Sequence, residues 1–475
     1  MSLLIPGTNS IKDTSYDVAN SLRFNGGSSD DLVRTPSSSG NNNKNTISVW
    51  LKRSRVDEED FIIYGLTSSA NRCKITFKSD NKLQINTIVS SSNNLVYETN
   101  RLFRDVGSWY HIVIAFDSTL GTAGDRVRLY INGTEETSFA TETHMGQNTS
   151  NFLSTSGTPV YIGSQASGNY FDGYMAEFVF IDGQQLDATS FGEFNSDSPT
   201  IWQPKDVSGL TFGTNGFHLD FENASSLGAD VSGNSNNFTV NNLTSIDQSI
   251  DTCTNNFATV NALQAWYPTS TDPVLTEGNL KIRTGKGSSS SAGYFYYVST
   301  IGFNTGKWYF EVKPTESTGN LLIGIVGKQP TTNAKFAEQA DGYMYGKNGN
   351  KRNNNVQSSY GATYDSNDII GVAVDLDNNK IYFSKNGTFQ DSGDPTSGST
   401  GTGSAYNVGT PSEGFYFTCV ASTDYAEQST FEFNYGSAPF SISSGNADDN
   451  GFGSFEYDVP AGYLAICTKN LGESG

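Results

Sequence analysis

The stretch IIGVAVDLDNNKIYFSKNG, residues 369–387, decides the fold of the second half of the chain. Before its first turn every second residue is apolar, which is the period of a β-strand with one face on a core. These residues are Ile370, Val372, Val374 and Leu376. Residues 377–380 then reverse the chain, Ile381 and Phe383 resume the alternation, and residues 385–387 reverse it again. The stretch therefore predicts an antiparallel meander.

The flanking segments extend this meander into a larger sheet structure. Upstream, the stretch GKWYFEVK (306–313) places Trp308, Phe310 and Val312 on one face. The stretch NLLIGIV (320–326) follows, and three aromatic residues stand downstream at 415–417. Strands rich in aromatic and β-branched residues between turn residues are typical of an all-β domain.

The first half of the chain carries a second, separate set of strand patterns. The stretch WYHIVIAF (109–116) is apolar on both faces, which predicts a central strand covered on both sides. The stretch RVRLYING (126–133) alternates and ends in Asn-Gly, a favoured hairpin turn because both residues tolerate positive φ. A third apolar run, FDGYMAEFVFID, spans residues 171–182.

The composition agrees with an all-β chain of more than one domain. Its 475 residues are enough for two or three domains. Aromatic residues reach 12%, whereas disordered chains are poor in them. The 49 glycines, with abundant Asn, Ser and Thr, indicate many turns between short strands.

The motifs of the first half resemble the laminin-G/concanavalin-A-like lectin jelly roll in order and spacing, and those of the second half resemble the SPRY (B30.2) sandwich. The resemblance implies an all-β fold of two tandem antiparallel β-sandwiches joined by a small β connector. We expect the jelly roll in residues 1–195, the connector in 196–260 and the SPRY-like sandwich in 261–440. A C-terminal extension, residues 441–475, is expected to pack on the SPRY-like domain.

Residues 251–261 and 458–471 resemble segments of large tailed-bacteriophage structural proteins, many of them from marine viruses. This resemblance implies a virion protein, made in the host bacterial cytoplasm, that acts as a tail-fibre or tail-tip adhesin for a host surface glycan or protein. The alternative is a capsid or tail decoration protein with no host ligand. Because tail adhesins are usually symmetric, we expect a homo-oligomer, with a trimer as one option, in contact with other virion proteins.

The charge of the chain bears on its partners. The net charge of −20 repels phosphate backbones and anionic lipid surfaces, so we expect no nucleic-acid partner. No segment approaches the length of a membrane span, so we expect no membrane insertion. The N-terminal residues MSLLIPG lack a basic region followed by a long apolar run, which argues against a signal peptide.

The sequence predicts a binding protein without catalytic residues. Glucanases with the jelly-roll fold carry a Glu-x-Asp-x-x-Glu strand, whereas Glu58, Glu59 and Asp60 are adjacent and do not all face one cleft. We interpret His111 as a core imidazole and Glu311 as a structural carboxylate. A polysaccharide depolymerase is therefore the least favoured function, and we expect that the chain is not an enzyme.

Calcium is the one cofactor that the sequence leaves open. Laminin-G modules often hold calcium at a rim, and the candidate ligands here are Asp117, Asp125 and Asp172. The alternative is that these residues serve as ordinary turn residues.

Exposed aromatic residues are the candidates for ligand binding. In SPRY domains the partner usually meets loops at one end of the sandwich, and the matching segment here is residues 341–352. Tyr343 and Tyr345 are candidates to stack on a sugar or a peptide, and Arg352 is a candidate to hydrogen-bond it. The alternative is that the tyrosines cap the core. Tyr170 and Trp202 are the corresponding candidates in the lectin-like domain.

Overall fold

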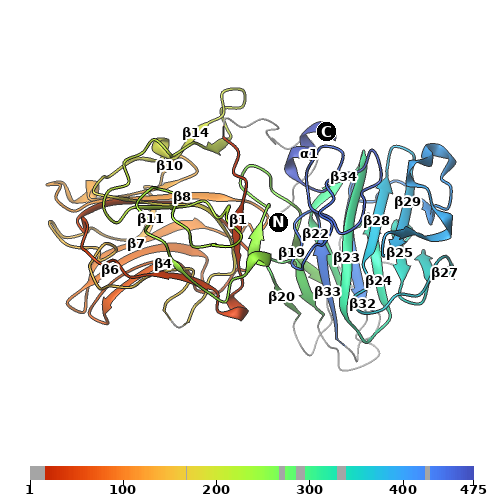
Figure 1. Ribbon diagram of the computed structural model, residues 1–475, viewed down its shortest axis with the longest axis horizontal. Coiled ribbons are helices and arrows are strands. Elements are labelled where there is room, and N and C mark those ends of the chain that lie inside the picture. The colour runs from red at the N-terminus through yellow and green to blue at the C-terminus, as the bar shows by residue number, and fades with distance from the viewer. Residues whose placement is uncertain are drawn as a thin grey trace. The chain divides into compact units, whose positions relative to one another are not determined.

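The chain folds into two compact units that divide between Thr254 and Asn255. Figure 1 shows a computed structural model of the chain. The structure describes residues 16–166, 168–266, 273–284, 295–328, 339–422 and 428–474. Within them, each unit contains two large sheets of almost entirely antiparallel strands with apolar side chains between the sheets. The prediction of an all-β fold with two tandem antiparallel sandwiches is therefore confirmed.

Two sheets of eight strands form the first unit, as far as its residues are described. The first sheet has the order β10 (Thr134–Glu135), β9 (Val127–Ile131), β8 (Tyr110–Asp117), β3 (Lys44–Arg53), β13 (Gly173–Asp182), β1 (Ser21–Phe24) and β18 (Gln248–Ser249), with β16 (Phe217–Leu219) paired to β13 off this path. The second sheet has the order β11 (Phe139–Thr143), β7 (Ser92–Leu102), β6 (Lys82–Val89), β5 (Asn71–Phe77), β4 (Asp60–Ser68), β12 (Val160–Ile162), β2 (Asp31–Arg34) and β17 (Thr239–Asn241).

The central strand of the first sheet, β8, behaves as its apolar pattern predicts. It lies between β3 and β9, with Ile112, Ile114 and Phe116 in the core between the sheets. Its opposite face is also buried, because Val113 belongs to an apolar cluster with residues 186–212. That segment includes the hairpin of β14 (Gly192–Phe194) and β15 (Trp202–Pro204). The segment covers the outer face of the first sheet and keeps its apolar side chains from water.

The expected connector, residues 196–260, is not a separate arm in the structure. Its strands β16, β17 and β18 pair with β13, β2 and β1, so they belong to the sheets of the first unit. The second unit then begins at Asn255. The sequence boundary was wrong because these strands are only two or three residues long, and their partners lie more than 35 residues away in the chain.

The second unit contains a seven-stranded and a nine-stranded sheet in its described residues. The first has the order β19 (Val260–Trp266), β22 (Phe295–Phe303), β32 (Tyr416–Ser422), β24 (Leu321–Val326), β25 (Gly342–Gly346), β26 (Asn350–Asn353) and β27 (Val356–Ser359). The second has the order β20 (Val274–Thr276), β21 (Lys281–Arg283), β33 (Ser429–Asn434), β23 (Lys307–Ser317), β28 (Ile370–Asp375), β29 (Lys380–Lys385) and β30 (Thr388–Phe389). Off this path, β31 (Tyr406–Asn407) pairs with β29, and β34 (Leu464–Ala465) pairs with β23 in parallel.

The C-terminal residues pack on the nine-stranded sheet. Ile466, directly after β34, and Leu471, within the short helix α1 (Thr468–Ser474, Figure 1), join the core of this unit. Glu311 on β23 is fully buried and accepts hydrogen bonds from the backbone N–H groups of Glu456 (3.0 Å) and Tyr457 (2.9 Å). Glu311 therefore has the structural role that the sequence suggested.

Candidate functional site

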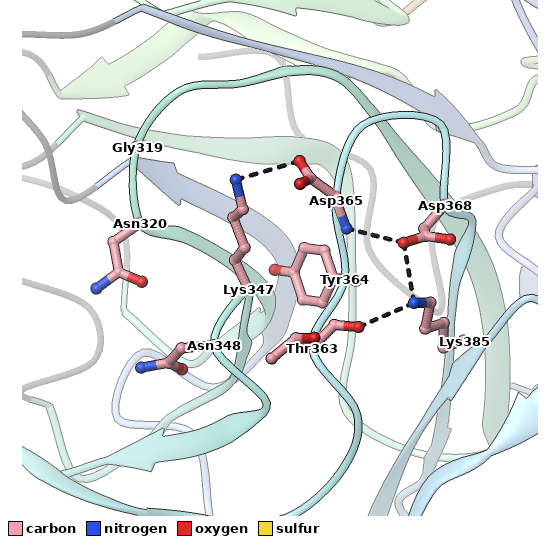
Figure 2. Close-up of a pocket in the computed structure, with 9 residues that line it drawn as sticks. All are labelled: Gly319, Asn320, Lys347, Asn348, Thr363, Tyr364, Asp365, Asp368 and Lys385. Atoms are coloured by element: carbon pink, nitrogen blue, oxygen red, sulfur yellow. Dashed lines mark hydrogen bonds and ion pairs between the residues drawn. The ribbon is translucent and has the colours of Figure 1, made fainter.

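The candidate site is an open pocket at one end of the second sandwich, which we call the end pocket (Figure 2). Three loops and the end of a strand form it: the residues before β24, the turn between β25 and β26, the loop between β27 and β28, and the end of β29. Its lining residues are Gly319, Asn320, Lys347, Asn348, Thr363, Tyr364, Asp365, Asp368 and Lys385, and its volume is about 450 Å³. Most of these side chains are polar, so the pocket suits a polar ligand.

Two ion pairs set the electrostatics of the end pocket. Lys347 Nζ lies 3.2 Å from Asp365 Oδ1, and Lys385 Nζ lies 3.1 Å from Asp368 Oδ2. Burial alone would raise the pKa of Asp368, but hydrogen bonds from the Asp365 N–H, Asn386 and Lys385 hold it below its ordinary value. Asp368 is therefore a fixed anion at neutral pH.

The Lys347–Asp365 pair is much more exposed than the other one. The Asp365 side chain is 72% exposed, against 20% for Asp368. Exposed ion pairs contribute only about 0–1 kcal/mol, so a ligand group can replace either partner at little cost. Figure 2 shows the Lys347 ammonium group extending toward Asp365.

A buried tyrosine holds the loops of the end pocket in place. Tyr364 is 2% exposed, and its hydroxyl lies 3.2 Å from the carbonyl oxygens of Leu321 and Tyr345. Its backbone N–H also donates to the Lys347 carbonyl. Burial raises the pKa of Tyr364, so the phenol stays protonated. These contacts join the loop after β27 to β24 and β25, which pre-organises the pocket.

The segment 341–352, expected to be a binding loop, lies mostly in strands β25 and β26. Tyr345 is fully buried, packs against Tyr360 and Tyr364, and donates a hydrogen bond to the Ala362 carbonyl. The expectation that Tyr345 stacks on a ligand is therefore wrong, because the strand period points it into the core. The segment still contributes Lys347 to the end pocket.

Tyr343 and Arg352 lie apart from the end pocket. Tyr343 is only 5% exposed, and its hydroxyl accepts a hydrogen bond from the Gly409 N–H (2.8 Å). Tyr343 also lines a second cavity of about 500 Å³ with Lys328, Asp341 and Thr410, at the other end of the β24–β25 hairpin. Arg352 is half-buried on β26 and lines neither cavity. The three predicted residues therefore do not form one site.

Trp202 covers the first sheet of the lectin-like unit. Its Nε1–H donates to Nδ1 of His111 (2.8 Å), and His111 in turn stacks on Trp50 with ring centroids 4.5 Å apart. A Cβ at Gly133 would overlap the Trp202 ring, so the Asn-Gly turn also makes room for it. Trp202 is half-buried and packs mainly within the protein.

His111 and Tyr170 are likewise part of the framework. Burial lowers the pKa of His111 to about 3, which keeps this core imidazole neutral. Tyr170 is half-buried, and its carbonyl accepts a hydrogen bond of 2.5 Å from Arg55. The structure does not bring Tyr170 and Trp202 together: Tyr170 lies before β13, on the side of Arg55, whereas Trp202 contacts His111 of β8.

The three expected calcium ligands do not converge. Asp117 forms an ion pair with Lys44 (2.7 Å) and accepts hydrogen bonds from Thr119, and Asp125 pairs with Arg128 (2.8 Å). Asp172 is 6% exposed and precedes β13. Among the described residues, no group of three or more His, Cys, Asp and Glu side chains could hold a metal ion. The proposed set of calcium ligands is therefore wrong, because the protein's own cations neutralise two of its members.

Sequence reasoning missed a buried ion pair in the first unit. Glu177 lies at a bulge in β13 with a φ of +48°, and its Oε2 lies 2.9 Å from Nε2 of His218 on β16. Burial would lower the pKa of His218, but the hydrogen bond and charge of Glu177, with Asp220 and Asp230, raise it. The bulge marks the point where β13 changes its partner from β1 to β16. No local sequence pattern predicts this pairing.

Two sequence families match separate parts of the chain. Residues 25–188 match the concanavalin A-like lectin/glucanases superfamily, and residues 307–436 match the SPRY domain. The chain therefore carries a concanavalin A-like lectin domain followed by a SPRY domain. Both assignments confirm what the strand motifs indicated.

Relatives among curated proteins match the SPRY region. The ATP-dependent RNA helicase DDX1 of Xenopus laevis is 35% identical over 91 residues, which are 19% of this chain and 12% of the helicase. The probable ATP-dependent RNA helicase ddx1 of Dictyostelium discoideum is 29% identical over 154 residues, 32% of this chain and 17% of that protein. The chain thus spans less than a fifth of the length of these helicases.

Solved structures show partial similarities to the chain. The SPRY domain of human HERC1 is 17% identical, with a TM-score of 0.29, and the match covers 37% of this chain and 96% of the HERC1 domain. A putative carbohydrate binding protein from Bacteroides ovatus is 15% identical, with a TM-score of 0.34, and the match covers 48% of this chain and 59% of the Bacteroides protein. At this identity both are similarities of fold alone.

In the described part of the chain, no helix is long and apolar enough to cross a membrane.

Proposed function

We propose that the chain is an adhesin of a virion, which binds a host surface glycan or protein through loops at the ends of its sandwiches. The observation that carries the proposal is the end pocket, an open polar cavity formed by three loops and the end of a strand at one end of the second sandwich. The tandem lectin-like and SPRY domains support a binding function. The resemblance of residues 251–261 and 458–471 to segments of phage structural proteins supports a place on a virion.

In this proposal the ligand competes for the exposed Lys347–Asp365 pair. A carboxylate or hydroxyl of the ligand takes over Lys347, or a ligand amine takes over Asp365. The more buried Lys385–Asp368 pair stays intact and keeps the loop in position. Weak single contacts are sufficient, because many copies on one particle multiply the affinity. The proposal includes no catalytic step.

The test is binding of the purified full chain to glycan and peptide arrays and to the envelope of candidate host cells. Lys347→Ala is expected to weaken binding by about tenfold, which equals about 1.4 kcal/mol. Arg283→Ala is a matched control, because Arg283 forms a similarly exposed ion pair with Glu316 but lies outside the end pocket. Equal effects of the two variants, or no binding on any surface, contradict the proposal.

A second function, assembly into the particle without a host ligand, is favoured by one observation. The edge strand β27 is exposed along its whole length, and Val356 on it is 64% exposed. Exposed edge strands accept strands from other proteins. Labelling of intact particles separates the two functions: hundreds of copies on the head shell favour decoration, and a few copies at the tail tip favour adhesion.

A further inference from the structure

The second sheet of the lectin-like unit presents a row of polar and aromatic side chains on its outer face. Cross-strand pairs connect four neighbouring strands in one register: Tyr161 on β12 pairs with Tyr64 on β4, Tyr64 with Lys74 on β5, and Lys74 with Asn86 on β6. Residues that pair directly across a sheet lie on the same face. Since strands lie about 4.8 Å apart, the stretch from Tyr161 to Lys74 spans about 10 Å, which is room for a short oligosaccharide.

These side chains face away from the core. The core between the two sheets takes the neighbouring residues of the same strands, among them Ile63, Ile75 and Ile85. Tyr161 and Lys74 are partly exposed, whereas Tyr64 and Asn86 are each only 4% exposed. Tyr64 lies beside Tyr161 with ring centroids 6.5 Å apart. The row therefore offers one accessible aromatic ring, supported from the side by a second.

The region is basic, although the chain as a whole is acidic. Residues 72–104 contain six Lys and Arg and two Asp and Glu, in a chain of net charge −20. Lys78 and Lys82 are neutralised by Glu98, to which each forms an ion pair. Arg72 and Lys74 remain on the row as the cations that are least neutralised.

Arg72 and Lys74 form only weak interactions with their neighbours. Arg72 donates to the carbonyl of Ser69, and no carboxylate lies within ion-pair distance of it among the described residues. Lys74 lies 3.7 Å from Glu59, and both side chains are partly exposed (24% and 36%). A ligand carboxylate can therefore approach both cations without breaking a strong pair.

We propose that this row, defined as Tyr64, Arg72, Lys74 and Tyr161 and called the basic row, binds an anionic oligosaccharide. The apolar face of a sugar packs on the Tyr161 ring, and the acid group of a neighbouring sugar pairs with Arg72 and Lys74. Asn86, at the far end of the cross-strand pairs, does not contact the ligand, because it is 4% exposed and its amide group donates to Asn93 and to the Leu95 carbonyl. The net charge of −20 disfavours an extended nucleic acid, because its phosphates would meet the acidic surroundings of this small patch.

This inference rests on the proposed binding function and specifies its ligand, but it concerns a different domain from the end pocket. The probe is an oligogalacturonate, a chain of uronic acids, with a neutral galactan oligomer and single-stranded DNA as comparison ligands. Calorimetric titration of the full chain is expected to detect the uronate alone. Raising the ionic strength from about 0.1 M to about 1 M shortens the Debye length from about 10 Å to about 3 Å and is expected to weaken binding strongly.

Variants of the row test its residues. Arg72→Gln with Lys74→Gln is expected to weaken uronate binding by about tenfold, and Tyr161→Ala by several-fold. The matched control is Arg101→Gln with Arg128→Gln, which removes two exposed positive charges of the same domain outside the row. The control is expected to bind within about twofold of the original chain. Thermal unfolding verifies that each variant is folded.

Several outcomes overturn the inference. They are no binding of the uronate, equal binding of the galactan or of the DNA, an equal loss in the control variant, and full binding by Tyr161→Ala. Arg283→Ala, which lies outside both the end pocket and the basic row, is included as a reference and is expected to bind the uronate normally. Loss of host binding in Lys347→Ala alone concerns the end pocket, whereas loss of uronate binding in the row variants alone concerns the basic row.

Discussion

Replacing Glu311 by alanine is expected to release the C-terminal residues from the second sandwich. The Glu311 carboxylate accepts four hydrogen bonds: from the N–H groups of Glu456 (3.0 Å) and Tyr457 (2.9 Å), from Nδ2 of Asn434 (3.0 Å) and from the hydroxyl of Tyr309 (3.2 Å). Glu311→Ala leaves these donors without their acceptor. A buried donor that loses its partner costs about 1–3 kcal/mol, and neighbouring losses are not additive. We expect the free energy of unfolding of this unit to fall by about 3–5 kcal/mol.

Chemical denaturation measures this loss, with the fluorescence of the buried Trp308 as a reporter in the second unit. Limited proteolysis followed by mass spectrometry is expected to show new cleavage within residues 441–457. Tyr309→Phe is the control: it removes one of the four donors and is expected to cost only about 0.5–1.5 kcal/mol. The reasoning is refuted by a Glu311→Ala variant whose free energy of unfolding lies within about 1 kcal/mol of that of the original chain and whose C-terminal residues stay protected from the protease.

Three further predictions concern the first unit. Burial lowers the pKa of His111 to about 3, so between about pH 6.5 and pH 3 the unfolded chain binds one more proton than the folded chain. The free energy of unfolding should therefore fall by up to about 1.4 kcal/mol for each pH unit as the pH drops through this range. His111→Gln should remove this slope in denaturant titrations, and an unchanged slope contradicts the assignment. Glu177 raises the pKa of His218, so this pair stabilises the fold fully below the ordinary pKa of histidine and loses its effect as pH rises through the raised pKa. The stability difference between the original chain and His218→Gln should therefore be larger at acidic than at alkaline pH, and a constant difference speaks against it. Asp251→Ala removes the carboxylate that pairs with the fully buried Lys52 and should cost about 3–5 kcal/mol in urea unfolding. Lys52→Met with Asp251→Leu should recover much of this loss, and a double variant as unstable as the single one refutes the pairing.

The domain organisation could be predicted from strand patterns, except at the domain boundary. The alternation in β8 and β28 identified central strands correctly, because apolar spacing reports which face of a strand is buried. The strands β16, β17 and β18 escaped prediction because their stability comes from pairing with distant partners. Strands of two or three residues carry too little pattern for an assignment.

The candidate site was predicted only in outline. The segment 341–352 was singled out, and it does contribute Lys347 and Asn348 to the end pocket. The residues chosen within it were the tyrosines, which the strand period turns into the core. Lys385 and Asp365 could not be foreseen as neighbours of Lys347, because nothing in the local sequence relates their loops.

By itself, the sequence determined that the chain forms two sandwiches of short strands, since the alternation of apolar residues with period two is a local property. The tertiary structure alone decided which charged side chains meet. Lys347 and Asp365 come together because the strand order places their two loops at the same end of the second sandwich. Tyr161 and Lys74 share a face of a sheet because the hydrogen-bond register aligns β12, β4 and β5. Both arrangements depend on pairings between residues far apart in the chain, and no local pattern encodes them.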